Sequence, residues 1–126
     1  MQHAPGFFKV VNEAMPRIRE ITLADARALL AKNPKAILMD VREDDEWKNG
    51  HAAGAIHLGR GVLERDIETV VPDAGAEIIM YCGGGYRSAL AAESAQRMGY
   101  KNVASLAGGY KAMVAEGWEM ASDSVR

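Results

Sequence analysis

The stretch from Ile78 to Met98 restricts the fold more than any other part of this 126-residue chain. An apolar run over residues 78–81 leads into Cys82 and three glycines, and small residues at helical spacing follow over residues 88–98. This order predicts a strand, a tight turn and a helix. Backbone N–H groups of such a turn can converge on one spot, where the helix N-terminus adds its positive end. We therefore expect an anion-binding turn within an α/β fold.

Cys82 is the only cysteine in the chain and lies where the predicted strand ends. A lone cysteine is usually a small buried hydrophobe, and a glycine-rich turn is often no more than a turn. Next to converging amides, however, the thiolate form of a cysteine is favoured and acts as a nucleophile. Arg87 can return over the same cavity as a fixed cation with fork-shaped donors. Together these features favour a reactive, anion-binding cysteine.

The spacing within the turn separates two classes of chemistry. Four residues lie between Cys82 and Arg87, whereas cysteine-dependent phosphatases have five residues between the equivalent Cys and Arg. A shorter loop makes a smaller ring of amides. Such a ring suits a sulfur atom carried on the thiol better than a tetrahedral phosphate held above it.

Length and composition predict one soluble globular domain with a single core. Apolar residues make up 48% of the chain and charged residues 25%, both ordinary proportions. A net charge of -2 gives no electrostatic case for nucleic acid or an anionic membrane as a partner. No apolar run approaches the roughly 20 residues that span a bilayer. The single cysteine and an N-terminus unlike a signal peptide lead us to expect a cytoplasmic protein.

Strand and helix patterns alternate along the rest of the chain, which predicts an α/β domain with a mainly parallel central sheet between helical layers. Thr22 is the expected N-cap of one helix, and Asn33-Pro34 ends that helix. We expect a helical extension over residues 1–17, the domain over 18–121 and a tail over 122–126. The expected strands cover residues 18–21, 36–41, the end of 50–58, 77–81 and 102–106, and the expected helices cover 7–15, 23–32, 43–49, 62–70, 88–98 and 111–116.

Several charged or polar residues fall near the predicted carboxyl ends of strands, where open α/β sheets form their sites. Asp40 and Arg42 follow an apolar run, and we expect Asp40 to orient a neighbouring arginine. His51 lies between small residues and is expected to be buried, with its ring bonded to the loop backbone. His57 has no cysteine or carboxylate at ligand spacing, so no metal site is expected. Arg60, between two glycines, can reach the cavity beside Arg87 or remain a surface charge.

Three motifs in register resemble those of the single-domain rhodanese family of sulfurtransferases. Residues 40–42 with 50–57 are similar to its first signature, residues 82–88 to its active-site loop and residues 106–110, with Gly117 beyond, to its C-terminal signature. The similarity covers residues 18–120 and implies a parallel sheet of about five strands flanked by helices. The sequence departs from the family at Met113, where a Trp is common, and at Gly83 and Gly84, where many members carry a charged or polar side chain.

The resemblance implies a sulfurtransferase without metal or cofactor that moves a sulfane sulfur from a donor such as thiosulfate to cyanide, a thiol or a protein, through a persulfide on Cys82. The implied catalytic residues are Cys82 and Arg87, and Asp40, Arg42 and His51 support the site. The implied donor-binding residues are Gly83, Gly84, Gly85, Tyr86, Ser88 and Arg60. Two alternatives are a carrier that holds the persulfide without turnover and a cysteine-dependent phosphatase or arsenate reductase.

Overall fold

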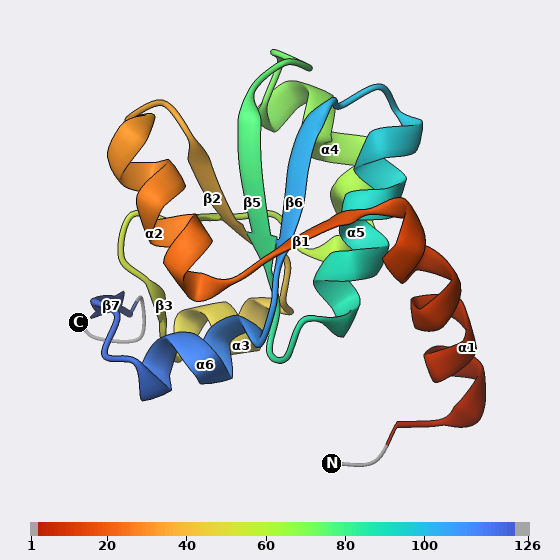
Figure 1. Ribbon diagram of the computed structural model, residues 1–126, viewed down its shortest axis with the longest axis horizontal. Coiled ribbons are helices and arrows are strands. Elements are labelled where there is room, and N and C mark those ends of the chain that lie inside the picture. The colour runs from red at the N-terminus through yellow and green to blue at the C-terminus, as the bar shows by residue number, and fades with distance from the viewer. Residues whose placement is uncertain (1–2, 123–126) are drawn as a thin grey trace.

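Five parallel strands form the central sheet in the order β1-β6-β5-β2-β4 (Figure 1). The computed structural model describes residues 3–122. The sheet order confirms the predicted α/β fold, with a mainly parallel sheet of about five strands flanked by helices. The strands are β1 (Arg19–Ile21), β2 (Ile37–Asp40), β4 (Ile56–His57), β5 (Glu77–Tyr81) and β6 (Asn102–Leu106).

Helices cover both faces of the sheet, with α2 on one face and α4 and α5 on the other (Figure 1). The N-terminal helix α1 lies outside α5, where Val11, Ala14 and Leu90 form a small core of their own. Within residues 3–122, no helix is long and apolar enough to cross a membrane. The α-helices are α1 (Pro5–Ala14), α2 (Leu23–Lys32), α3 (Asp44–Lys48), α4 (Leu63–Val70), α5 (Tyr86–Arg97) and α6 (Gly109–Ala115), and 3-10 turns cover Met15–Arg17 and Arg60–Val62.

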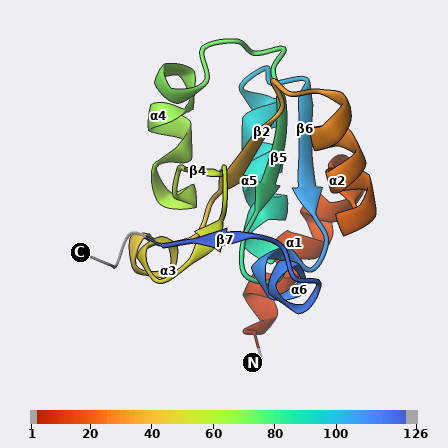
Figure 2. The same cartoon turned by 90° about the vertical axis from the view of Figure 1, so that its left-hand side faces the viewer.

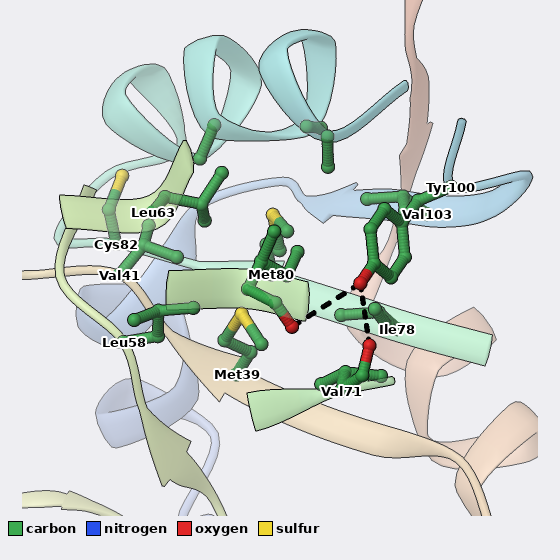
Figure 3. Close-up of a cluster of buried hydrophobic side chains, with 14 residues drawn as sticks. Met39, Val41, Leu58, Leu63, Val71, Ile78, Met80, Cys82, Tyr100 and Val103 are labelled. Atoms are coloured by element: carbon green, nitrogen blue, oxygen red, sulfur yellow. Dashed lines mark hydrogen bonds between the residues drawn. The ribbon is translucent and has the colours of Figure 1, made fainter. Parts of the chain in front are cut away.

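Alternation along β5 divides the core between the two faces of the sheet. Ile78 and Met80 pack toward α4 and α5, whereas Ile79 and Tyr81 pack toward α2 and α6. All four side chains are fully buried, as expected for a central strand covered on both faces. Cys82 continues the first of these two sets and belongs to the cluster shown in Figure 3.

Two local predictions hold at the ends of helices. Thr22 and Asp25 form a reciprocal capping box at the start of α2, and α2 ends at Lys32, before Asn33. In contrast, α5 begins at Tyr86, two residues earlier than the apolar pattern predicts. The helix can begin there because Gly85, with φ of 106°, makes the left-handed turn that precedes it.

The stretch over residues 50–58 contains two strands where the sequence predicts one. A turn at Gly54, with φ of 83°, separates β4 from β3 (His51–Ala52). Strand β3 leaves the main sheet and pairs antiparallel with β7 (Met120–Ala121), a strand that the sequence does not predict. Of the predicted tail, Ser122 donates a hydrogen bond to the Lys48 carbonyl, and residues 123–126 lie outside the described part of the chain. The division of the chain at residues 17 and 121 stays a prediction.

Candidate active site

The carboxyl ends of the parallel strands meet at one edge of the sheet, which α3 and α6 border (Figures 1 and 2). Asp40 ends β2, Cys82 follows β5, and the turn at Gly108 follows β6. Because parallel strands bring their carboxyl ends to the same edge, residues far apart in the sequence come together there. The candidate site is built around Cys82, as the sequence analysis expects.

The Cys82 thiol lies beneath the loop with 1% of the residue exposed. Two backbone amides donate to its Sγ, that of Gly85 at 3.1 Å and that of Ser88 at 3.3 Å. Ser88 belongs to the first turn of α5, so its N–H has no partner within the helix and is free to bond the sulfur. The turn therefore points both amides and the positive end of the α5 dipole at the sulfur.

The start of α6 keeps the loop in this orientation. The amide of Tyr110 donates to the Cys82 carbonyl at 2.7 Å, and that of Lys111 donates to the Gly83 carbonyl at 3.1 Å. These two carbonyl oxygens bond to α6, while the amides of Gly85 and Ser88 bond the thiol. A Cβ atom on Gly109 would overlap the Cys82 carbonyl, so only glycine permits this approach. This role of Gly109 was not predicted from the sequence, although the glycine pair at 108–109 could have signalled it.

A short chain of hydroxyl groups lies behind the thiol. The Cys82 thiol donates to Ser88 Oγ at 3.6 Å, and Ser88 Oγ is hydrogen-bonded to Ser105 Oγ at 2.8 Å. Both serines are fully buried. Because either hydroxyl can be the donor in this pair, Ser88 can turn its hydrogen toward a thiolate while Ser105 donates to Ser88. Ser88 is among the predicted site residues, whereas Ser105, on β6, was not predicted from the sequence.

Arg87 lies at the loop in an ion pair that the sequence analysis did not foresee. Its Nη1 donates to Glu46 Oε1 at 2.7 Å and its Nη2 donates to Glu46 Oε2 at 3.1 Å. Hydrogen bonding between the two side chains lowers the pKa of Glu46 and raises the pKa of Arg87. A Cβ atom on Gly83 would lie 3.1 Å from Arg87 Nη2, so the glycine leaves room for the guanidinium. Contact between Arg87 and a donor stays a prediction.

Asp40 and Arg42 form the expected ion pair, and both are buried. Nη2 of Arg42 lies 2.8 Å from Asp40 Oδ2 and also donates to the Gly50 carbonyl at 2.6 Å. Burial lowers the pKa of Arg42, but its hydrogen bond to Asp40 and that carboxylate's charge outweigh burial, and the net pKa is raised. The guanidinium lies 4.1 Å over the Tyr110 ring, so it links the end of β2 to the helix that holds the loop.

The two histidines of this edge are bonded to the backbone. His51 is 5% exposed, its Nδ1 is hydrogen-bonded to the Trp47 carbonyl at 2.8 Å, and its ring stacks on Trp47. This is the arrangement that the sequence analysis expects of His51. His57 Nε2 is hydrogen-bonded to the Arg42 carbonyl at 2.9 Å. Within the described residues, no three His, Cys, Asp or Glu side chains gather as metal ligands.

The remaining predicted residues lie at the surface around the loop. The Tyr86 ring packs against a cluster from the N-terminal segment, with ring centroids 5.1 Å from His3, 6.2 Å from Phe7 and 5.6 Å from Phe8. Gly84 is exposed. Arg60 is also exposed, and its side chain makes no hydrogen bond or ion pair among residues 3–122. The structure thus brings Cys82, Gly85, Arg87 and Ser88 together and leaves Arg60 at the surface.

Comparisons with known proteins agree with the fold described above. A family model described as the rhodanese-like domain matches residues 22–116. Thiosulfate sulfurtransferase GlpE of Coxiella burnetii is 32% identical over 82 residues, which are 65% of this chain and 75% of GlpE. YrkF of Bacillus subtilis is 27% identical over 100 residues, 79% of this chain and 53% of YrkF, so the chain spans about half of that relative.

Among solved structures, the chain is similar to a Rhodopseudomonas palustris protein of unknown function described as a possible tyrosine phosphatase. The two are 32% identical with a TM-score of 0.83, over 96% of this chain and 98% of the other. The polysulfide-sulfur transferase homodimer of Wolinella succinogenes is 28% identical with a TM-score of 0.79, over 93% of this chain and 88% of that one. The fold of these relatives thus extends over nearly the whole chain.

Proposed function

Because the chain belongs to the rhodanese-like domain family, we propose that it transfers a sulfane sulfur from a donor such as thiosulfate to a thiophilic acceptor, through a persulfide on Cys82. The observation that carries this proposal is the pair of amides, from Gly85 and Ser88, that donate to Sγ at the N-terminus of α5. Sulfur transfer by relatives such as GlpE supports it. The acceptor is cyanide in the test tube and a small thiol or a protein thiol in the cell.

In the first step, the Cys82 thiolate attacks the outer sulfur of thiosulfate. The new bond joins Sγ to that sulfur, and the S–S bond of thiosulfate breaks, with its electron pair leaving on sulfite. Cys82 then carries a persulfide with one negative charge on the terminal sulfur. The Gly85 and Ser88 amides and the α5 dipole are aimed at Sγ before the reaction begins, and they stabilise negative charge on the thiolate and on the persulfide bonded to it, as donors do in an oxyanion hole.

In the second step, the acceptor attacks the terminal sulfur. With cyanide, a carbon–sulfur bond forms, the persulfide S–S bond breaks, and its electron pair returns to Cys82 as a thiolate. Thiocyanate leaves, and the site is ready for another donor. The cycle uses one cysteine, which agrees with a chain that contains only one. A disulfide exchanger would need a second, resolving thiol.

The test is to incubate the protein with thiosulfate and then cyanide, and to follow intact mass and thiocyanate. We expect a gain of one sulfur atom that cyanide discharges with turnover. The Cys82→Ser variant should fold normally and neither gain sulfur nor produce thiocyanate. Loading without turnover would instead favour the carrier, in which Cys82 hands its sulfur to one specific partner.

A phosphatase is the second candidate, because a structural relative is described as a possible tyrosine phosphatase. The loop argues against it, since four residues between Cys82 and Arg87 make a ring of amides small for phosphate. Hydrolysis of p-nitrophenyl phosphate by the protein, lost in Cys82→Ser, would overturn the sulfurtransferase proposal. We expect no such hydrolysis above that of the variant.

A further inference from the structure

We propose that Glu46 determines which donors Cys82 accepts: by cancelling the charge of Arg87, it favours sulfane donors with one negative charge over dianions such as thiosulfate. The inference rests on the proposed function, because it concerns the donor of the same reaction. It goes beyond that function by assigning Glu46 a role in specificity and by naming the charge class of the preferred donor.

The geometry holds the Glu46 carboxylate against Arg87. Both carboxylate oxygens accept from the guanidinium, at 2.7 Å and 3.1 Å, and Oε1 also accepts from the Glu43 amide at 2.9 Å. The second contact is the capping box of α3, so the backbone of this helix fixes the side chain. The side chains of Arg87 and Glu46 are 31% and 37% exposed, which places the pair at the solvent boundary of the loop.

Once this pair is counted, the acidic side chains around the loop outnumber the basic ones. Arg87 is the only cation among residues 82–88, and Arg42 is buried and paired with Asp40. Arg60 and Lys111 are exposed, and their side chains make no ion pair within residues 3–122. The helix that carries Glu46 adds three exposed carboxylates beside the pair, from Glu43, Asp44 and Asp45.

A second negative charge on a donor therefore meets repulsion that a monoanion avoids. Thiosulfate and methanethiosulfonate form a matched pair for this comparison, since each delivers one sulfane sulfur. From methanethiosulfonate, the Cys82 thiolate takes the outer sulfur, the S–S bond breaks, and methanesulfinate leaves with the electron pair. The same persulfide forms from either donor, so the two reactions differ in the charge and identity of the leaving group.

The experiment measures kcat/KM for both donors with saturating cyanide, and reports the ratio of thiosulfate to methanethiosulfonate so that shared effects on Cys82 cancel. We expect Glu46→Gln to raise this ratio about three- to tenfold at low salt, because it restores an uncompensated Arg87. Glu46→Asp keeps the charge and should leave the ratio closer to that of the wild type. Asp45→Asn removes a charge from the same helix without contacting Arg87, and should move the ratio less than twofold.

A salt series on the wild type tests the proposal without any variant. From about 0.01 M to about 1 M salt, the Debye length falls from roughly 30 Å to 3 Å. In a site that repels the second charge, the ratio rises or stays level with salt. A steep fall of the ratio with salt would mean a cationic site and would overturn the proposal. In the variant experiment, no shift of the ratio in Glu46→Gln, or equal shifts in Glu46→Gln and Asp45→Asn, would also overturn it. If neither donor loads sulfur on Cys82 by mass, the proposed function itself fails.

Discussion

At the scale of single residues, the thiol of Cys82 depends on groups that come from three separate stretches of the chain. The amides of Gly85 and Ser88 are supplied by its own loop. Ser105 lies on β6 and reaches the thiol only through the Ser88 hydroxyl. Glu46 lies on α3 and acts on the loop through Arg87. The loop motif therefore contains the nucleophile, but two of the side chains that act on the nucleophile and its loop, Ser105 and Glu46, lie outside the motif.

Ser105→Ala tests the hydroxyl chain behind the thiol. Without Ser105, the Ser88 hydroxyl loses the partner that lets it donate to a thiolate while its own oxygen stays satisfied. We expect alkylation of Cys82 by iodoacetamide at pH 7 to slow about two- to tenfold, which corresponds to one hydrogen bond of roughly 0.5–1.5 kcal/mol. Turnover with thiosulfate and cyanide should fall by a similar factor.

The matched control is Ser94→Ala, which changes a serine of α5 that makes no side-chain hydrogen bond within the described residues. Its alkylation rate should equal that of the wild type. If Ser105→Ala alkylates as fast as Ser94→Ala, Ser105 only fills space behind the thiol.

At the scale of elements, the loop is a joint between β5, α5 and α6. Strand β5 ends directly before Cys82, α5 supplies the amide of Ser88, and amides of α6 donate to the carbonyl oxygens of Cys82 and Gly83. The buried pair of Asp40 and Arg42 extends this joint to β2. The geometry of the site is thus set by how closely α6 approaches the loop.

Gly109→Ala is the substitution that interferes most directly with this approach. Gly109 has φ of +53°, and an added Cβ would overlap the Cys82 carbonyl. We expect a loss of about 2–4 kcal/mol in the free energy of unfolding, from the left-handed backbone and from overpacking together. Sulfur transfer should fall further than stability alone explains, because α6 can no longer fix the loop. Urea unfolding and thiocyanate production measure the two effects.

Gly117→Ala separates the backbone cost from the clash. Gly117 also has a positive φ, +76°, but nothing lies within 4 Å of an added Cβ. This variant should lose about 1 kcal/mol of stability and keep its turnover. Equal losses in both variants would show that the close approach of α6 has no special importance.

At the scale of the whole molecule, features that depend on the order of neighbouring residues could be predicted from the sequence. Contacts that depend on how distant elements are placed against each other could not. The order of strand, glycine turn and helix at residues 78–98 predicted the turn around Cys82, because each part is local. The alternation of strand and helix patterns along the chain predicted the mainly parallel sheet. The bond between Arg87 and Glu46 joins residues 41 positions apart, and no periodicity in the chain reports it. β3 and β7 have two residues each, too few for an alternating pattern to be recognised.

The stability of the whole molecule should depend on pH through the same ion pair that we assign to specificity. The hydrogen bond from Arg87 lowers the pKa of Glu46 in the folded state below its ordinary value of 4.5. The pair therefore contributes fully above that ordinary value, and its contribution is lost as the pH falls through the lower, folded pKa. Because both side chains are about one-third exposed, we expect a contribution of no more than about 0.5–1 kcal/mol at pH 7.

The measurement is the free energy of unfolding in urea for the wild type and for Glu46→Gln between pH 3 and pH 7. Glu46→Gln should be less stable than the wild type at pH 7, and the two curves should converge toward pH 3. Glu119→Gln is the control, since Glu119 is exposed, lies outside the helices and makes no ion pair within the described residues. Its difference from the wild type should stay near zero throughout. A gap for Glu46→Gln that is constant with pH would mean that the carboxamide disturbs packing at the loop, and that the charge of Glu46 is not what stabilises the pair.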